Sequence, residues 1–326
     1  MEINMKNEKI WSFFMYLSNH MWDDEHTPPR GWYEKPRYEE CNNVNVETWD
    51  ETMKFLAERQ FNMVLIDVGD GIKYESRPEI SAPDAWDKDF LKKKLDEMRA
   101  LGLEPIPKLN FSCKHHTWLK KYRYMVSTPE YYAACADVIR EVCEAFGHPR
   151  FIHLGLDEER VGVADEFREF IHVRNTRLWW NDAYFFFKEA EKNGARPWIW
   201  ADYYWNNPDI FAEKMPREVL QSNWCYSRMH DKLSPTSNMA KSVPTYEALD
   251  KLGFDQIPCG SCCTGQGGVN LFQTLSLAKD KMTDERTLGF MVAPWTRTEP
   301  ANEFCIKDNA HRLYVARQKV YPETLK

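Results

Sequence analysis

Hydrophobic and polar positions divide this chain into two kinds of segment. Short apolar runs, typical of buried strands, alternate with stretches in which apolar residues recur every three or four positions, which is typical of amphipathic helices. The pattern predicts strands at residues 11–17, 61–68, 103–109, 151–156, 196–201, 219–222, 254–258 and 288–293. It predicts helices at residues 48–60, 90–101, 129–146, 178–192, 246–252, 271–281 and 304–321, with a short one at 209–215.

Local signals support several of these boundaries. Thr48 and Glu51 have the spacing of a capping box, so we expect the first helix to begin there. Thr128 precedes Pro129, and proline is favoured in the first turn of a helix. Gly102 follows the second helical stretch, where a glycine commonly ends a helix.

The alternation of strands with helices predicts an α/β protein with a parallel sheet. Eight such units suit a single (β/α)8 TIM barrel formed by residues 1–326 as one domain. The fifth and sixth strands lie only about 22 residues apart, which is short for a crossover unit of about 30. The alternative is an open doubly wound sheet, but its glycine-rich phosphate turn does not follow the first strand here.

Composition narrows the class of protein. A formal net charge of -7 argues against nucleic acid and anionic membranes as partners, because both attract basic surfaces. Aromatic residues make up 14% of the chain, with 13 Trp, and they suit the flat apolar faces of sugars as well as a protein core. No apolar run approaches the roughly 18 residues of a membrane helix. We therefore expect a cytoplasmic protein, unless a secretion leader has been removed.

Cysteine and histidine spacing gives no sign of a metal centre. The nine cysteines include the adjacent Cys262 and Cys263 but no CxxC pair, so we expect reduced thiols. His115 and His116 lie in a basic loop without a third ligand at a telling spacing. Residues 265–268 resemble a phosphate loop, yet no Lys-Ser/Thr follows them. We expect neither a metal nor an organic cofactor.

Polar side chains gather where the predicted strands end. The carboxyl ends of barrel strands meet at one mouth, where active sites lie. Each polar residue there has a structural alternative as a turn, cap or packing residue, but their concentration favours a polar site with aromatic walls. The candidates are Asp67, Asp70, Asn110, Asp157, Glu158, Asp202, Tyr203, Asn223, Trp224 and Trp295.

The fourth predicted strand ends in three consecutive carboxylates, Asp157, Glu158 and Glu159. Adjacent carboxylates repel each other, so one of them tends to hold a proton near neutral pH, as a general acid must. The alternative is a solvated acidic turn, which is common after a strand. His153 lies within the strand and is expected to be a hydrogen-bonded core residue.

Two segments carry a resemblance to a known family. Residues 153–158 (His-Leu-Gly-Leu-Asp-Glu) resemble the His-x-Gly-x-Asp-Glu motif of the β-N-acetylhexosaminidases of glycoside hydrolase family twenty. In that family the motif ends the fourth strand of a (β/α)8 barrel, as it does in the predicted order here. Residues 294–296 (Pro-Trp-Thr) are similar to the family's late Trp-Thr-Glu element, and Trp198, Trp200 and Tyr203 resemble its aromatic pocket.

The resemblance implies retaining, exo-acting hydrolysis of a terminal N-acetylhexosamine by substrate assistance, without an enzyme nucleophile. Glu158 would protonate the glycosidic oxygen and later activate water. Asp157 would hold the 2-acetamido group, whose carbonyl oxygen attacks the anomeric carbon, and Tyr203 or Tyr204 would assist it. The remaining candidates for substrate binding are Trp200, Trp224, Trp295, Asn110, Asp67, Asp202 and Glu299.

The chain also departs from the family pattern. Leu156 replaces the motif's second glycine, and Arg297 replaces the Glu after Trp-Thr, with Glu299 the nearest acid. The family's arginine at the end of the first strand has no counterpart before Arg30. We also expect no accessory domain ahead of the barrel.

These departures leave three alternatives open. One is a retaining glycosidase with Asp202 or Glu299 as nucleophile, acting on another sugar. A second is a barrel that binds carbohydrate without catalysis. The third is a metal-dependent isomerase or aldolase with Asp67, Asp157 and Asp202 as ligands.

Overall fold

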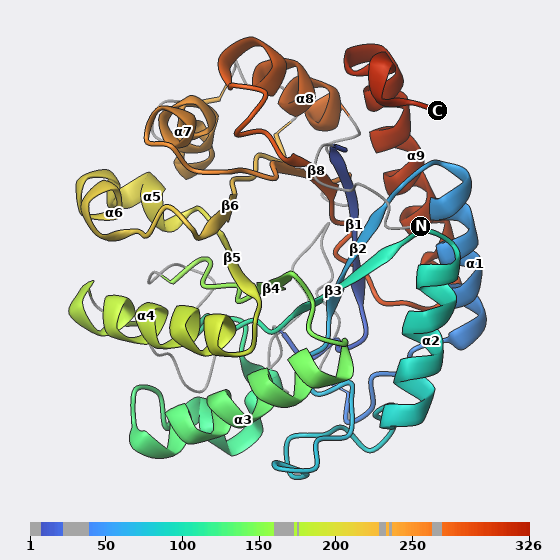
Figure 1. Ribbon diagram of the computed structural model, residues 1–326, viewed down its shortest axis with the longest axis vertical. Coiled ribbons are helices and arrows are strands. Elements are labelled where there is room, and N and C mark those ends of the chain that lie inside the picture. The colour runs from blue at the N-terminus through green and yellow to red at the C-terminus, as the bar shows by residue number, and fades with distance from the viewer. Residues whose placement is uncertain are drawn as a thin grey trace.

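The computed structural model describes residues 8–21, 39–159, 173–174, 176–227, 233–234, 237–262 and 269–326. Eight parallel strands stand in a ring at the centre of the molecule, with the helices outside (Figure 1). They are β1 (Ile10–Tyr16), β2 (Met63–Asp67), β3 (Glu104–Lys108), β4 (Phe151–His153), β5 (Arg196–Trp200), β6 (Leu220–Ser222), β7 (Cys259–Gly260) and β8 (Gly289–Val292).

The strands follow the order β6-β5-β4-β3-β2-β1-β8-β7. Strands that are consecutive in the chain are neighbours in the sheet, and β1 lies next to β8. The exception is β6 and β7, which stand at the two ends of this order. Isolated bridges between Gln221 and Gln256 and between Trp224 and Cys259 join those ends, so the sheet nearly closes. The predicted (β/α)8 barrel is therefore confirmed, and the doubly wound alternative is wrong.

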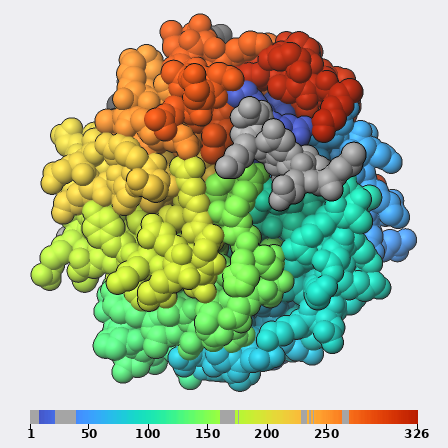
Figure 2. Space-filling model, in the orientation of Figure 1, coloured from blue at the N-terminus to red at the C-terminus, as the bar shows by residue number. Residues whose placement is uncertain are grey.

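The helices follow one another around the barrel in chain order. In Figure 2 the colours run around the rim from the blue and cyan of the first helices to the orange and red of the last. No helix in the described part of the chain is both long and apolar enough to cross a membrane. The helices are α1 (Val46–Glu58), α2 (Lys88–Ala100), α3 (Pro129–Ala145), α4 (Thr176–Lys192), α5 (Tyr203–Asn206), α6 (Pro208–Lys214), α7 (Asn238–Lys251), α8 (Val269–Lys281) and α9 (Glu303–Val320), with a 3-10 segment at Thr117–Tyr124.

Several boundaries differ from those predicted, among them that of β4, which ends at His153 rather than at residue 156. The seventh strand is Cys259–Gly260 rather than residues 254–258, because Pro258 has no N–H to donate and interrupts the pairing. The cap of α1 is Asn45, whose side chain accepts a hydrogen bond from the N–H of Thr48, so Thr48 lies inside the helix. Helix α7 begins at Asn238, well before residue 246, and accommodates Pro244 in its interior.

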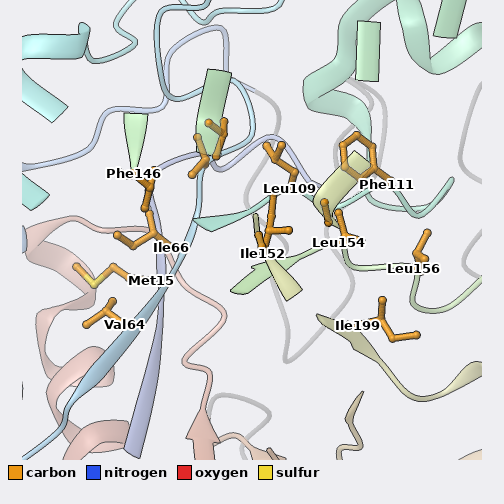
Figure 3. Packing of buried hydrophobic residues seen from close by; sticks show 14 of the residues in the cluster. Met15, Val64, Ile66, Leu109, Phe111, Phe146, Ile152, Leu154, Leu156 and Ile199 are labelled. Carbon is orange, nitrogen blue, oxygen red and sulfur yellow. The ribbon is translucent and has the colours of Figure 1, made fainter. Parts of the chain in front are cut away.

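Strand side chains alternate between two hydrophobic layers. Met15, Val64 and Ile66 point outward and pack into a large cluster that includes side chains of the surrounding helices (Figure 3). Phe14 and Leu65, which are paired in register, point into the barrel and belong to a separate interior cluster. This alternation follows from the two-residue period of a strand, and it fills the barrel so that a site can lie only at an end.

The interior layer at the C-terminal ends of the first strands is polar. Register aligns Tyr16 with Asp67, Asp67 with Lys108, and Lys108 with His153. Lys108 and Asp67 form a buried ion pair. Burial, assisted by the charge of Lys108, lowers the pKa of His153 well below its usual value, so the ring is neutral and its Nδ1 accepts the Gly155 N–H at 3.0 Å. The expectation that His153 is a hydrogen-bonded core residue is confirmed.

Cys41, Cys113, Cys135, Cys143, Cys225 and Cys305 form no disulfide within the described residues. Cys263, Arg30 and residues 265–268, which the sequence analysis singled out, lie outside the described residues.

Candidate active site

The loop after β4 separates the three consecutive carboxylates and gives each a different environment. Asp157 is buried and accepts a hydrogen bond from Asn110 Nδ2 at 3.0 Å. Glu158 borders a pocket, and its side chain keeps 42% of its exposure. Glu159 turns back into the protein, where Arg174 pairs with it. Asp157 and Glu158, the two acids predicted to act together, therefore lie side by side at the site, whereas Glu159 forms a structural ion pair.

Backbone conformation explains how two adjacent side chains reach the same site. Leu156 and Glu158 both adopt left-handed φ angles, of 65° and 56°. This conformation costs an L-residue roughly 1–2 kcal/mol, and it folds the chain back on itself in place of a straight strand. Leu156 stands where the resembled motif has a second glycine. A glycine would adopt this left-handed φ without strain, whereas Leu156 adopts it at a cost in conformational energy.

Gly155 meets a stricter requirement. It has a φ of +72°, and a Cβ on it would lie 1.9 Å from Asn110 Oδ1. Asn110 follows β3, and its main-chain oxygen accepts the indole N–H of Trp118 at 2.9 Å. The glycine therefore allows Asn110 to approach β4 closely enough to reach Asp157.

His115 lies between the two acids. Its Nε2 is 3.2 Å from Asp157 Oδ2 and 3.3 Å from Glu158 Oε2. Burial lowers the pKa of His115, but the two carboxylates outweigh burial and the net direction is upward. Burial likewise opposes ionisation of Asp157, yet His115, Lys108 and Asn110 bring the pKa of Asp157 down to about 2. Asp157 is thus an anion, and its charge raises the pKa of the imidazole beside it.

The pKa of Asp202 is shifted in the opposite direction from that of Asp157. Burial, with the charge of Asp157, raises the pKa of Asp202 to about 7. Its Oδ2 accepts the backbone N–H of Glu158 at 2.8 Å, which supports the left-handed turn at the acid. The site thus contains one carboxylate that stays ionised and one that holds its proton to near neutral pH.

A pocket of about 220 Å³ opens beside Glu158. Its walls come from the loop after β4 and from the segment after β5, and Trp224 closes one side. In Figure 1 this segment, α5, lies outside β5 and β6. Three of the predicted substrate-binding residues, Asp202, Tyr203 and Trp224, line it.

Aromatic rings occupy the barrel mouth next to this pocket. Trp200 and Trp295 have ring centroids 5.7 Å apart, and Phe14 lies 4.7 Å from Trp295. Tyr226 stacks on Trp224 at 4.9 Å and reaches Trp295 at 6.4 Å. The structure therefore brings Trp200, Trp224 and Trp295 into one aromatic wall.

Other predicted residues lie at the edge of this arrangement. Asp67 is engaged below it in the ion pair with Lys108. Tyr203 reaches the pocket, but one face of its ring stacks on Trp179 at 3.8 Å. Glu299 accepts a hydrogen bond from Asn302 at 2.8 Å in the turn before α9. Tyr204 packs its ring edge-on against Phe211.

A buried charge cluster supports the acid loop from behind. Arg174 pairs with Glu159 and, at 2.9 Å, with Asp182 of α4, and it donates to the main-chain oxygen of Phe111 at 2.8 Å. The N–H of Cys113 donates to Glu159 at 3.1 Å. These contacts join the loops after β3 and β4 to α4, which fixes the position of the acids.

A second buried residue with many partners, Asp70, lies at the start of the loop after β2. Ser18 Oγ donates to its Oδ1 at 2.7 Å and Asn42 Nδ2 at 3.3 Å. His20 Nδ1 and Lys120 Nζ contact its Oδ2 at 2.6 Å and 2.7 Å. Asp70 therefore has a structural role: it holds the loops after β1, β2 and β3 together.

No group of three or more His, Cys, Asp or Glu side chains among the described residues is placed to hold a metal ion. Asp67, Asp157 and Asp202, the ligands of the metal-dependent alternative, instead take separate partners: Lys108, His115 and the backbone of Glu158.

Sequence reasoning missed two partners of the acid pair. His115 was weighed only as a metal ligand, although its place after the third strand, five residues beyond Asn110, puts it at the same mouth. Lys108 lies within a predicted strand and was not considered as a site residue. Its ion pair with Asp67 in the neighbouring strand allows the lysine to be buried there.

In its fold the chain is similar to the barrels of β-N-acetylhexosaminidases, as comparison with solved structures shows. It superposes on the family twenty β-N-acetylhexosaminidase from Streptomyces coelicolor A3(2) with a TM-score of 0.61 at 12% identity, covering 93% of this chain and 63% of that one. It matches an exo β-N-acetylglucosaminidase from Vibrio harveyi, solved with N-acetylglucosamine, with a TM-score of 0.61 at 11% identity, over 98% and 58%.

Dispersin B is similar over almost its whole length, with a TM-score of 0.60 at 12% identity, covering 96% of this chain and 99% of that one. The chain spans about three fifths of the length of the Streptomyces and Vibrio proteins. Neither a protein-family model nor a curated protein sequence matches it.

Proposed function

We propose that the protein is a glycoside hydrolase that removes a terminal N-acetylhexosamine by substrate-assisted, retaining catalysis. The observation that carries the proposal is the acid pair after β4, where Asp157 and Glu158 both lie within 3.3 Å of His115 Nε2. The similarity in fold and the match of residues 153–158 to the family motif support it.

The electrostatics suit a division of labour between the two acids. Asp157 is ionised, so it can accept the N–H of a 2-acetamido group and offset the positive charge that develops when the acetamido oxygen attacks the anomeric carbon. Glu158 borders the pocket and can deliver a proton to the departing oxygen. His115 can hydrogen-bond Glu158 once that proton has left.

The alternative with an enzyme nucleophile is less well supported. Asp202 has a pKa of about 7, so a large fraction of it is protonated near neutral pH, and one of its two oxygens accepts the Glu158 N–H. Glu299 is held by Asn302. Neither carboxylate has the environment of a ready nucleophile.

The test compares Glu158→Gln with the unaltered protein on aryl 2-acetamido-2-deoxy glycosides. We expect kcat/KM to fall by roughly 10²- to 10⁴-fold, the usual contribution of a general acid. The loss should be larger for a poor leaving group than for a good one, because a good one needs less protonation. Glu144→Gln, on the exposed surface of α3, is the matched control and should leave the rate unchanged.

Three results would contradict the proposal. Unchanged turnover in Glu158→Gln would remove Glu158 from the mechanism. Equal rates on glycosides with and without the 2-acetamido group would exclude substrate assistance and favour the nucleophile mechanism. Sugar binding without turnover by the unaltered protein would instead establish the non-catalytic alternative.

A further inference from the structure

The peptide unit between Asp157 and Glu158 is held by side chains on both sides. β4 lies between β3 and β5 in the barrel (Figure 1), so the loop that follows it has a neighbouring loop on each side. From the β3 side, Ser112 Oγ donates a hydrogen bond to the main-chain oxygen of Asp157. From the β5 side, Asp202 Oδ2 accepts the main-chain N–H of Glu158 at 2.8 Å. Both polar groups of this one peptide unit are therefore used.

The serine on the β3 side is itself fixed. Ser112 is fully buried, and its own N–H donates to Asn110 Oδ1 at 3.0 Å. Its Oγ also accepts the N–H of Lys114 at 3.2 Å. Because Asn110 in turn donates to Asp157 Oδ1 at 3.0 Å, Ser112 belongs to a short network that includes the side chain of the first acid.

The partner on the β5 side is a buried carboxyl. Asp202 keeps only 9% of its exposure, and its second oxygen, Oδ1, is buried without a hydrogen-bond partner among the described residues. Burial, with the charge of Asp157, raises the pKa of Asp202 to about 7, so below that pH the carboxyl is largely neutral. A neutral carboxyl can accept the Glu158 N–H without placing a further negative charge beside the two acids.

Glu158 needs this support because its main chain is strained. A left-handed φ of 56° is unfavourable for an L-residue. Rotation of the peptide unit between the acids would change this angle and would move the Glu158 side chain relative to the pocket that it borders. Hydrogen bonds to both ends of the peptide unit oppose such a rotation.

We propose that Ser112 and Asp202 form a clamp on the peptide unit between the two acids, and that this clamp positions Glu158 for proton transfer. In this role each acts through the main chain of the acid loop and not on the reacting atoms. The inference rests on the proposed function of Glu158, and it gives Asp202 a task that a neutral acceptor can perform.

The experiment compares Asp202→Ala, Asp202→Asn and Ser112→Ala with the unaltered protein at about pH 6, below the pKa of Asp202, where asparagine is the closest mimic of the neutral carboxyl. The two substrates share one reacting sugar. A phenyl 2-acetamido-2-deoxy-β-glycoside has a poor leaving group that needs a proton, whereas the corresponding glycosyl fluoride needs one far less. Asp209→Asn, on the exposed surface of α6, is the matched control and should leave both rates unchanged.

We expect kcat/KM for the phenyl glycoside to fall by roughly two- to tenfold in Asp202→Ala and in Ser112→Ala, the effect of losing one neutral hydrogen bond. Turnover of the fluoride should change by less than about twofold, because a displaced acid matters less to it. Asp202→Asn should stay within about twofold of the unaltered protein on both substrates, because its amide oxygen can accept the same N–H.

Hydrogen exchange at the Glu158 amide tests the clamp without any turnover. Exchange should be faster in Asp202→Ala, where the N–H loses its acceptor, and unchanged in Asp202→Asn and Asp209→Asn. Unfolding in urea of the same variants checks that each one is folded under the assay conditions.

Three results would overturn the clamp: unchanged exchange at Glu158 in Asp202→Ala, equal losses of rate on the two substrates, or a loss in Asp202→Asn as large as in Asp202→Ala. The last result would mean that the site needs an ionised Asp202, as a nucleophile mechanism does. If exchange responds as expected but the unaltered protein hydrolyses neither substrate, the proposed function fails and only the clamp on the main chain remains. If Glu158→Gln is inactive but exchange does not respond, the proposed function stands and the clamp fails.

Discussion

Gly155 offers the sharpest test of how the fold positions the acid pair. A Cβ at this position would lie 1.9 Å from Asn110 Oδ1 and 2.9 Å from Asn110 Cα, so the clash involves backbone as well as a side chain. The φ of +72° adds roughly 1–2 kcal/mol for any L-residue, and overpacking adds roughly 1–3 kcal/mol. Gly155→Ala should therefore reduce the free energy of unfolding by about 2–5 kcal/mol.

Gly194 separates the two contributions. Its φ is +78°, nearly that of Gly155, but nothing lies within 4 Å of the Cβ that alanine would add. Gly194→Ala should cost only the conformational part, about 1–2 kcal/mol. The assay is urea unfolding of both variants, with the midpoint and slope compared with those of the unaltered protein. Equal destabilisation by the two substitutions would refute the close approach of Asn110 to β4.

Two further predictions concern the charges around the acids. The pKa of Asp202 is raised to about 7 in the folded state, so its contribution to stability is full below about pH 4 and is lost as the pH rises through about 7. Unfolding titrations should show this loss, up to about 1.4 kcal/mol per pH unit, in the unaltered protein but not in Asp202→Asn; parallel curves would contradict it. Arg174→Met leaves Glu159 and a second carboxylate buried without their partner, so we expect it to cost about 3–5 kcal/mol by urea unfolding. Arg150→Met breaks a partly exposed pair and should cost less than about 1 kcal/mol; similar costs would show that burial does not govern the difference.

The architecture of the barrel was predictable because its strands are buried on both faces. Apolar runs such as residues 61–68 stand out from the amphipathic helices, and eight of them in alternation leave few topologies. The one strand that was misplaced, β7, has only two residues and follows Pro258, so its own sequence carries little signal. The cap of α1 was misassigned because Asn45 and Thr48 are both good capping residues and only the tertiary path selects one.

The acid pair was predictable from the end of β4, but its electrostatics were not. Adjacency predicts that one of Asp157 and Glu158 holds a proton but not which one; in the structure His115 keeps Asp157 ionised, and the pKa of a third acid, Asp202, is raised. These partners come from segments about 40 residues away on either side, and the partner of Glu159 is Arg174, which precedes α4. Pairing across such distances depends on the folded barrel and leaves no periodic trace in the sequence.

Asp70 has a consequence for how this barrel can change. Because the buried carboxylate of Asp70, after β2, is held by residues that follow β1 and β3, replacing either of those two connections alone with a foreign loop would remove partners from an interior charge. We therefore expect the connections after β1, β2 and β3 to change together. New specificities in this lineage should arise by variation elsewhere on the rim, and chimeras that exchange all three connections together should fold where single exchanges fail.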